Sequence, residues 1–203
     1  MTEEEARDWA VARFDAEAIA RLDHLAAIVT VESDQQNLIA RSTLATIWTR
    51  HIVDSLQLAP LAPDQGDWLD IGTGAGFPGL ALAAVQPDRR FILVEPRRLR
   101  ADFLRDAVAA LDLPNAEVVT GKVETMRTPV AVISARAVAQ VAPLIASAIR
   151  CASNETLWLL PKGRSAREEV ARAQQRWHGM FHVEQSITDP ESSIVIARGV
   201  RAR

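Results

Sequence analysis

The segment from Asp70 to Gly79 has the residue types and spacing that point most directly to chemistry. Its four glycines are Gly72, Gly74, Gly76 and Gly79. Glycines at every second position let the chain turn tightly and let a ligand approach main-chain atoms. Pro78 suits the first turn of a helix that follows the loop. A turn without a ligand does not need three alternating glycines, so the segment predicts a nucleotide-binding loop.

Two classes of nucleotide ligand fit this loop. The last three glycines match the spacing of the dinucleotide-binding fingerprint. Asp70, two residues before the first glycine, favours S-adenosylmethionine instead. Its carboxylate is placed to pair with the ammonium group of a methionine moiety, whereas it would repel a pyrophosphate. We therefore expect S-adenosylmethionine as the cofactor, with a dinucleotide as the alternative.

Two further acidic residues fit a nucleoside ligand. Glu95 ends the second predicted strand, where it can accept hydrogen bonds from the ribose hydroxyls of either ligand class. Glu124 follows the third predicted strand, where the adenine edge lies in a methyltransferase fold. A plain surface carboxylate fits the spacing of Glu124 equally well.

Short apolar segments alternate with helical patterns from residue 67 onward. The predicted strands are 68–71, 91–94, 117–120, 130–133 and 156–160, followed by a closing pair at 181–187 and 193–198. The predicted helices between them are 80–85, 99–111, 141–149 and 164–177. This alternation predicts an α/β fold with a mostly parallel central sheet and helices on both faces. Such sheets bind ligands at the carboxyl ends of their strands.

The first 65 residues have apolar positions at helical spacing. Thr2 and Glu5 form a capping-box pair at the start of the first helix. A further helix is expected over 42–58, with Ser42 as its N-cap. We therefore expect a helical segment in front of the sheet.

The composition of the 203-residue chain narrows its class. Apolar residues make up 48% and charged residues 24%, which is typical of one globular domain or one domain with a short extension. The longest apolar run, 80–85, is too short to span a membrane, and the acidic segment 1–5 is unlike a signal or transit peptide. The single cysteine, Cys151, excludes an internal disulfide and a multi-cysteine metal site, so we expect it buried. These features predict a cytoplasmic protein without a metal.

The net charge of −3 does not indicate a nucleic-acid-binding protein. Arginines nevertheless cluster at 89–90, 97–100, 164–176 and 198–203. A local basic face and an ordinary solvated surface both fit this pattern.

Several short motifs, in the same order along residues 35–165, resemble the RsmG (GidB) family of bacterial 16S ribosomal RNA guanine-N7 methyltransferases. They are the glycine loop 69–79 with its Gly-Phe-Pro-Gly ending, Asn37-Leu38, Arg50-His51-Ile-Val-Asp54-Ser55-Leu56, Val123-Glu124, Ser134-Ala-Arg136-Ala137 and Lys162-Gly163. The resemblance implies a class I S-adenosylmethionine-dependent methyltransferase fold, Rossmann-like, with a closing antiparallel strand. It also implies a helical extension, 1–65, packed on a methyltransferase domain, 66–203.

The resemblance also implies roles for individual residues. Together with the loop analysis, it gives as cofactor-binding residues Asp70, Gly72, Gly74, Gly76, Phe77, Glu95, Val123, Glu124 and Arg136. The residues expected to face the target RNA or the reacting centre are Arg50, His51, Arg136 and Lys162. Without the family, His51 could pack within its helix, Arg136 could form a structural ion pair and Lys162 could be a surface lysine. Ser55 is expected only to fix its helix to the sheet.

The implied reaction needs alignment more than proton transfer. Guanine N7 has a free lone pair at neutral pH, so it can attack the sulfonium methyl group directly while S-adenosylhomocysteine leaves. The segment 134–137 replaces the Asn/Asp-Pro-Pro-aromatic turn of amino-group methyltransferases, which agrees with a ring-nitrogen target. We expect His51, Arg136 and Lys162 to orient the guanine or its phosphates rather than accept protons.

The expected partner is 16S ribosomal RNA or the small ribosomal subunit, bound by a monomer, with no membrane involved. Three other functions fit the same loop. A small-molecule methyltransferase would have a closed apolar substrate pocket, and a dinucleotide-binding redox module would prefer NAD. A non-catalytic RNA assembly factor would transfer no methyl group.

Overall fold

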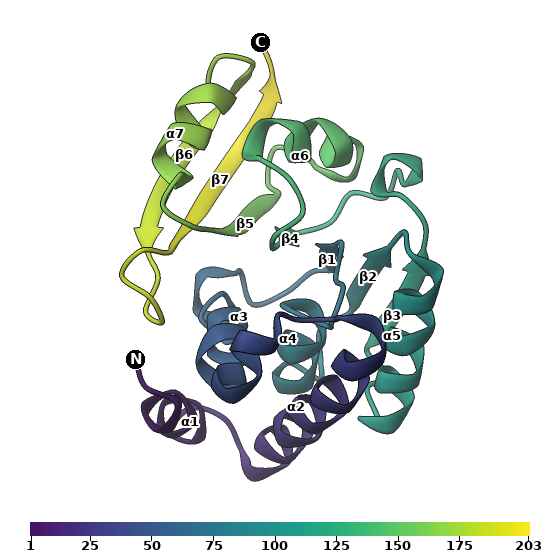
Figure 1. Ribbon diagram of the computed structural model, residues 1–203. Helices are drawn as coiled ribbons and strands as arrows, with labels where there is room; N and C mark the ends of the chain where they lie inside the picture. Colours follow the sequence, from purple (N-terminus) through teal and green to yellow (C-terminus); the bar gives the residue numbers. More distant parts are fainter.

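The computed structural model describes residues 1–203 and has a seven-stranded sheet as its middle layer (Figure 1). The strand order is β3-β2-β1-β4-β5-β7-β6. The strands are β1 (Trp68–Ile71), β2 (Phe91–Glu95), β3 (Ala116–Thr120), β4 (Val132–Ala135), β5 (Leu157–Lys162), β6 (Trp177–Gln185) and β7 (Ser193–Ala202). The first five are parallel to one another, and β7 is antiparallel to both β5 and β6. This confirms the predicted sheet with its closing antiparallel strand.

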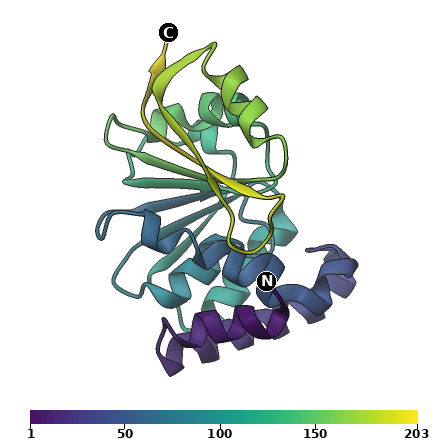
Figure 2. The same ribbon diagram turned by 90° about the vertical axis from the view of Figure 1, so that its left-hand side faces the viewer.

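Helices cover both faces of the sheet (Figures 1 and 2). On one face lie α1 (Glu3–Val11), α2 (Ala16–Gln36), α3 (Asp54–Leu56), α4 (Gly79–Val85) and α5 (Arg98–Ala110). On the other face lie α6 (Val141–Ala148), η5 (Ile149–Cys151) and α7 (Ala166–Ala173). Successive strand residues point to opposite faces, so Trp68 and Leu159 join the first apolar cluster while Leu69 and Leu160 join the second. Cys151 is fully buried, as expected.

Several predicted boundaries were wrong: the closing strands, expected at 181–187 and 193–198, are Trp177–Gln185 and Ser193–Ala202, and the last helix, expected over 164–177, is Ala166–Ala173. Two of the differences have a clear physical cause. The fourth strand begins at Val132 rather than Val130, because the Val130 N–H donates to the Cys151 carbonyl, 3.0 Å away, instead of to a neighbouring strand. Trp177, expected to end the last helix, begins β6 and is paired with Ala202. Its ring packs against the apolar cluster under α6 and α7, and this burial decides its place.

The stretch predicted as one helix over 42–58 is three short pieces instead. A 3₁₀-helix, η1 (Arg41–Thr46), leads into a π-helical turn, η2 (Trp48–Val53), and then into α3. Ser42 does not cap η1, whose N-cap residue is Ala40. The main-chain N–H of Trp48 donates instead to the Glu3 carboxylate, at 2.6 Å. The capping box of Thr2 and Glu5 is confirmed.

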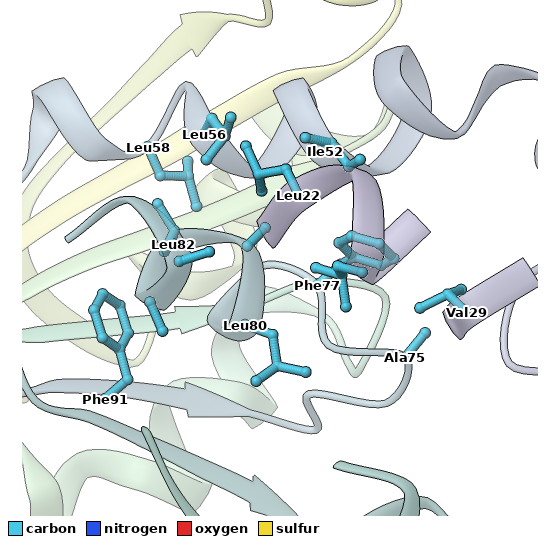
Figure 3. Close-up of a cluster of buried hydrophobic side chains, with 14 of the residues drawn as sticks. Leu22, Val29, Ile52, Leu56, Leu58, Ala75, Phe77, Leu80, Leu82 and Phe91 are labelled. Carbon is cyan, nitrogen blue, oxygen red and sulfur yellow. The ribbon is translucent and has the colours of Figure 1, made fainter. Parts of the chain in front are cut away.

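The N-terminal helices share one apolar cluster with the glycine loop (Figure 3). Leu22 and Val29 of α2 and Ile52 of η2 pack in the same cluster as Phe77 and Leu80. This packing fixes the glycine loop against the segment that holds Arg50 and His51. A short 3₁₀-helix, η3 (Ala59–Leu61), leads toward β1, and another, η4 (Val123–Thr125), follows β3. The division of the chain into two parts at residue 65 stays a prediction.

None of the helices has both the length and the apolar composition that a membrane span requires.

Candidate active site

A cavity of about 590 Å³ opens at the carboxyl ends of β4 and β5. Its walls come from the N-terminal segment, the 136–140 loop after β4, the end of β5, α7 and the connection between β6 and β7. Polar and charged side chains dominate its lining. The cavity brings together all four residues expected to face the RNA or the reacting centre, which are Arg50, His51, Arg136 and Lys162.

His51 is a neutral, fully hydrogen-bonded imidazole in the wall of this cavity. Its Nδ1 accepts a hydrogen bond from Nη2 of Arg136 at 2.8 Å, so the ring proton belongs on Nε2, which is 2.8 Å from Oγ1 of Thr43. Burial, followed by the charges of Arg136 and Arg50, lowers the pKa of His51 from 6.5 to about 3. Both ring nitrogens are therefore engaged, and neither is a free proton acceptor.

Arg136 joins the cavity to the glycine loop. Its Nη1 donates to Oδ2 of Asp54 at 3.1 Å and to the Arg50 carbonyl at 2.8 Å. Its guanidinium also lies 5.5 Å from the centre of the Phe77 ring, and the His51 ring lies 5.2 Å from the same ring. The structural ion pair considered for Arg136 thus exists, and it holds the guanidinium beside the loop.

Lys162 forms a nearly buried ion pair instead of extending from the surface. Its Nζ lies 3.1 Å from Oε2 of Glu169, and the two side chains are only 9% and 10% exposed. The Lys162 ammonium also donates to the carbonyl of Ala139, and Glu169 accepts the N–H of Val141 at 3.0 Å. These bonds fasten the 136–140 loop and the start of α6 to α7.

Arg50 is the most accessible of the four. Its side chain is 47% exposed and donates to Oδ2 of Asp189 at 2.6 Å. Arg50 lines the cavity, and the ion pair with Asp189 leaves about half of its side chain accessible.

The glycine loop has the geometry that its sequence predicted. Gly72, Gly74 and Gly76 have φ values of 65°, 60° and 98°, in the left-handed region that other residues rarely adopt. Glu95 accepts the Gly74 N–H at 3.0 Å and the Arg97 N–H at 2.9 Å. A carboxylate has about four lone-pair positions, so two are left for ribose hydroxyls.

The segment after β3 and the 136–140 loop lie next to the glycine loop in the positions that the sequence predicted for cofactor binding. Val123 is buried and Glu124 is exposed on η4, directly after β3. A Cβ atom added to Gly72 would lie 2.6 Å from Cγ2 of Val138, so the 136–140 loop lies directly against the glycine loop. The loop, the buried acid and Glu124 fit the adenosine of S-adenosylmethionine. Their contacts with the cofactor stay predictions.

Asp70 is buried beneath the glycine loop and is hydrogen-bonded to its last glycine. Its side chain has no exposed surface, and its oxygens accept the hydroxyl of Ser134 at 2.7 Å and the N–H of Gly79 at 3.0 Å. Burial raises the pKa of Asp70 from 3.8 to about 6, despite these hydrogen bonds. The carboxylate therefore positions the glycine loop in this conformation, and its pairing with a cofactor ammonium group stays a prediction.

Several residues of the site had no signal in the sequence. Thr43, Glu169 and Asp189 contact predicted site residues, and Thr188 contacts Asp54 of the family motif, yet each lies in an ordinary polar segment. Asp189 meets Arg50 across 139 positions of sequence. No spacing pattern encodes such a contact, because it exists only after two segments far apart in the sequence have packed together.

Comparisons with known proteins agree with this architecture. The family model GidB, rRNA small subunit methyltransferase G, matches residues 18–196. The chain is 47% identical to the ribosomal RNA small subunit methyltransferase G of Novosphingobium aromaticivorans, over 98% of this chain and 89% of that protein. It is 46% identical to that of Rhizorhabdus wittichii, over 100% of this chain and 95% of the relative.

Solved structures show the same fold at low sequence identity. A SAM-dependent methyltransferase from Aquifex aeolicus superposes with a TM-score of 0.62 at 16% identity, covering 82% of this chain and 97% of the other. A TehB-like SAM-dependent methyltransferase from Corynebacterium glutamicum gives 0.54 at 14% identity, covering 72% and 86%. The predicted class I methyltransferase fold is confirmed. Because the family model and the relatives span nearly the whole length, the chain belongs to the GidB family, rRNA small subunit methyltransferase G.

Proposed function

We propose that this chain transfers a methyl group from S-adenosylmethionine to N7 of a guanine in 16S ribosomal RNA. The observation that carries the proposal is the polar cavity whose lining residues Arg136 and His51 lie against the Phe77 ring of the glycine loop. The names of the relatives supply the class of substrate. The base N7 and its reaction follow from the family resemblance.

The residues of this site suit alignment. S-adenosylmethionine, when bound, supplies the sulfonium methyl group. The chain has to hold the flat base in line with that group and keep it there, which is where most of the rate gain of such a reaction arises. His51 has no free nitrogen for proton transfer, and a guanine N7 needs none. Arg136 and His51 therefore form a rigid wall for the base.

The exposed cations suit the RNA backbone. Arg97 and Arg98 follow β2 at the same edge of the sheet as the glycine loop, and the side chain of Arg98 is 89% exposed. Arg50 lies at the cavity itself. We assign these arginines to phosphate contacts, which position an RNA without reading its sequence.

The polar lining argues against the small-molecule alternative, which calls for a closed apolar pocket. We propose that a monomer is active. Sedimentation of the protein with and without RNA measures that state.

The test is transfer of labelled methyl from S-adenosylmethionine to 16S ribosomal RNA or small subunits taken from cells that lack this gene. Mass mapping should find one N7-methylguanine, at one position. Variant Glu95→Ala, which removes the acid of the cofactor loop, is the control and should lose both labelling and S-adenosylmethionine binding. Labelling of another atom, or no labelling with the intact chain, would overturn the proposal.

A further inference from the structure

The connection between β6 and β7, residues 186–192, reaches back to the N-terminal segment, whereas the C-terminus lies on the opposite side of the molecule (Figures 1 and 2). We call these residues the hairpin tip. The contact is polar and almost completely buried. Gln57, Ser186 and Thr188 are each only 5% or 6% exposed.

Gln57 is the centre of this contact. Its Oε1 accepts the main-chain N–H of Ile187 at 3.0 Å. Its Nε2 donates to Oδ1 of Asp54 at 2.9 Å and lies 3.1 Å from Oγ of Ser186. One amide side chain therefore ties the hairpin tip and Asp54 together, across about 130 positions of sequence.

Thr188 completes the contact at Asp54. Its Oγ1 donates to Oδ1 of Asp54 at 3.2 Å and lies 2.9 Å from Oγ of Ser186. Oδ1 of Asp54 thus receives two donors, and Oδ2 is left to face Nη1 of Arg136 at 3.1 Å. The rotation of the carboxylate is fixed by its bonds to Gln57 and to Thr188 of the tip.

We propose that the hairpin tip positions the reaction centre, with Thr188 and Gln57 holding Asp54 so that Asp54 holds Arg136 against Phe77 and His51. A buried polar network of this kind fixes one geometry, because each member is hydrogen-bonded only when all the others are in place. The inference rests on the proposed function, which it deepens by naming positioning residues for the same cavity. Thr188 also lines that cavity, so the tip both forms part of the cavity wall and positions Asp54.

The test compares Thr188→Val with Thr188→Ser. Valine keeps the volume of threonine and removes the hydroxyl, whereas serine keeps the hydroxyl. We expect kcat/KM for the RNA to fall about tenfold in Thr188→Val, as for a lost hydrogen bond to a charged group, and to recover in Thr188→Ser. The Kd for S-adenosylmethionine should stay within about twofold of the parent, since Thr188 has no part in the cofactor loop.

A second measurement needs no RNA and so separates this inference from the proposed function. The charge of Arg136 contributes to the low pKa of His51, so loosening Arg136 should raise that pKa toward its ordinary value. Nuclear magnetic resonance of the imidazole, titrated in both variants, reports it. A higher pKa of His51 in Thr188→Val, with the parent value in Thr188→Ser, supports the proposed positioning of Arg136 by the hairpin tip. An unchanged pKa with an unchanged kcat/KM overturns it, even if the parent protein methylates 16S ribosomal RNA.

A double-mutant cycle guards against a general loss of folding. Asp54→Asn removes the charge opposite Arg136, and Thr188→Val in that background should cost no further activity, because Thr188 acts through Asp54. Additive losses would show that Thr188 works by another route and would contradict the proposal. If the parent protein itself transfers no methyl group, the proposed function fails while the His51 titration still decides the inference.

Discussion

At the scale of single residues, the site depends on two groups whose buried environments shift their pKa in opposite directions. Asp70 is fully buried and its pKa rises to about 6, whereas His51 is largely buried between two arginines and its pKa falls to about 3. Desolvation, which disfavours the charged form of each, is the first cause in both cases. Asp70 is therefore partly protonated in mildly acidic solution, and His51 stays neutral there.

The pH dependence of stability follows from these directions. The raised pKa of Asp70 contributes stability that is fully present below pH 3.8 and is lost as the pH rises through about 6. At roughly 1.4 kcal/mol for each pKa unit, the full difference is about 3 kcal/mol. His51 acts in the opposite sense, because its contribution is present above pH 6.5 and is lost as the pH falls toward about 3.

Asp70→Asn separates the two contributions. The amide keeps an acceptor for the Gly79 N–H and carries no charge to desolvate. In the parent protein, Asp70 makes the free energy of unfolding fall between about pH 4 and pH 6. We expect this fall to be absent in the variant when unfolding is measured with urea. An identical pH profile in the variant and the parent would show that the buried carboxyl does not have a raised pKa.

At the scale of elements, the strands and their mostly parallel arrangement were predictable, because buried parallel strands are apolar runs bounded by turn residues. The glycine loop was predictable for a related reason, since its φ values require glycine at fixed spacing. The π-helical turn η2 was not predictable. The Glu3 carboxylate meets the N–H groups of Trp48 and Thr49 at its start, and this contact spans 45 residues. A tertiary contact of this kind overrides local propensity.

The 136–140 loop is the element whose position depends most on one ion pair. Glu169→Gln leaves Lys162 buried without its counter-charge, so the free energy of unfolding should fall by roughly 3 kcal/mol. Methyl transfer should fall too, because the Ala139 carbonyl loses a firmly placed donor. Urea unfolding and single-turnover transfer measure the two effects.

A paired variant controls for the charge itself. Lys162→Met with Glu169→Gln removes both charges and keeps an acceptor for the Val141 N–H. It should regain most of the lost stability while transfer stays low. A double variant that is as unstable as Glu169→Gln would show that the buried lysine is not the cause.

At the scale of the whole molecule, segments from the N-terminal and C-terminal parts of the sequence meet at the cavity. Arg50 and Asp54 come from the N-terminal segment, and Thr188 and Asp189 come from the hairpin tip. The family motifs predicted Arg50, His51, Arg136 and Lys162 as one group, and the structure places them in one cavity. Their partners in the hairpin tip could not be predicted from the sequence. The local sequence of a polar turn that packs on another segment does not differ from that of a turn exposed to solvent.

The charge of the whole molecule bears on how RNA binding depends on salt. The net charge is −3, so binding of RNA must depend on local arginines rather than on overall attraction. Arg98→Gln should weaken RNA binding and reduce the slope of log K against log salt by about 0.7 to 0.9, the loss of one phosphate contact.

Arg90→Gln is the matched control for the salt experiment. Arg90 precedes β2, at the amino edge of the sheet, and is paired with Asp67 and Glu117. Its loss should leave the slope unchanged. Equal changes of the salt slope in the two variants would mean that the RNA does not bind preferentially at the carboxyl ends of the strands.

The central claim is that the cavity aligns a guanine for transfer and takes no proton from it. Single-turnover methyl transfer to 16S ribosomal RNA, measured between about pH 5.5 and pH 8 in the parent and in His51→Asn, tests that claim most directly. We predict a lower rate in the variant with a pH profile of the same shape, since the pKa of His51 lies near 3. A step near pH 6.5 in the parent that disappears in His51→Asn would show that His51 accepts a proton, and would contradict the account.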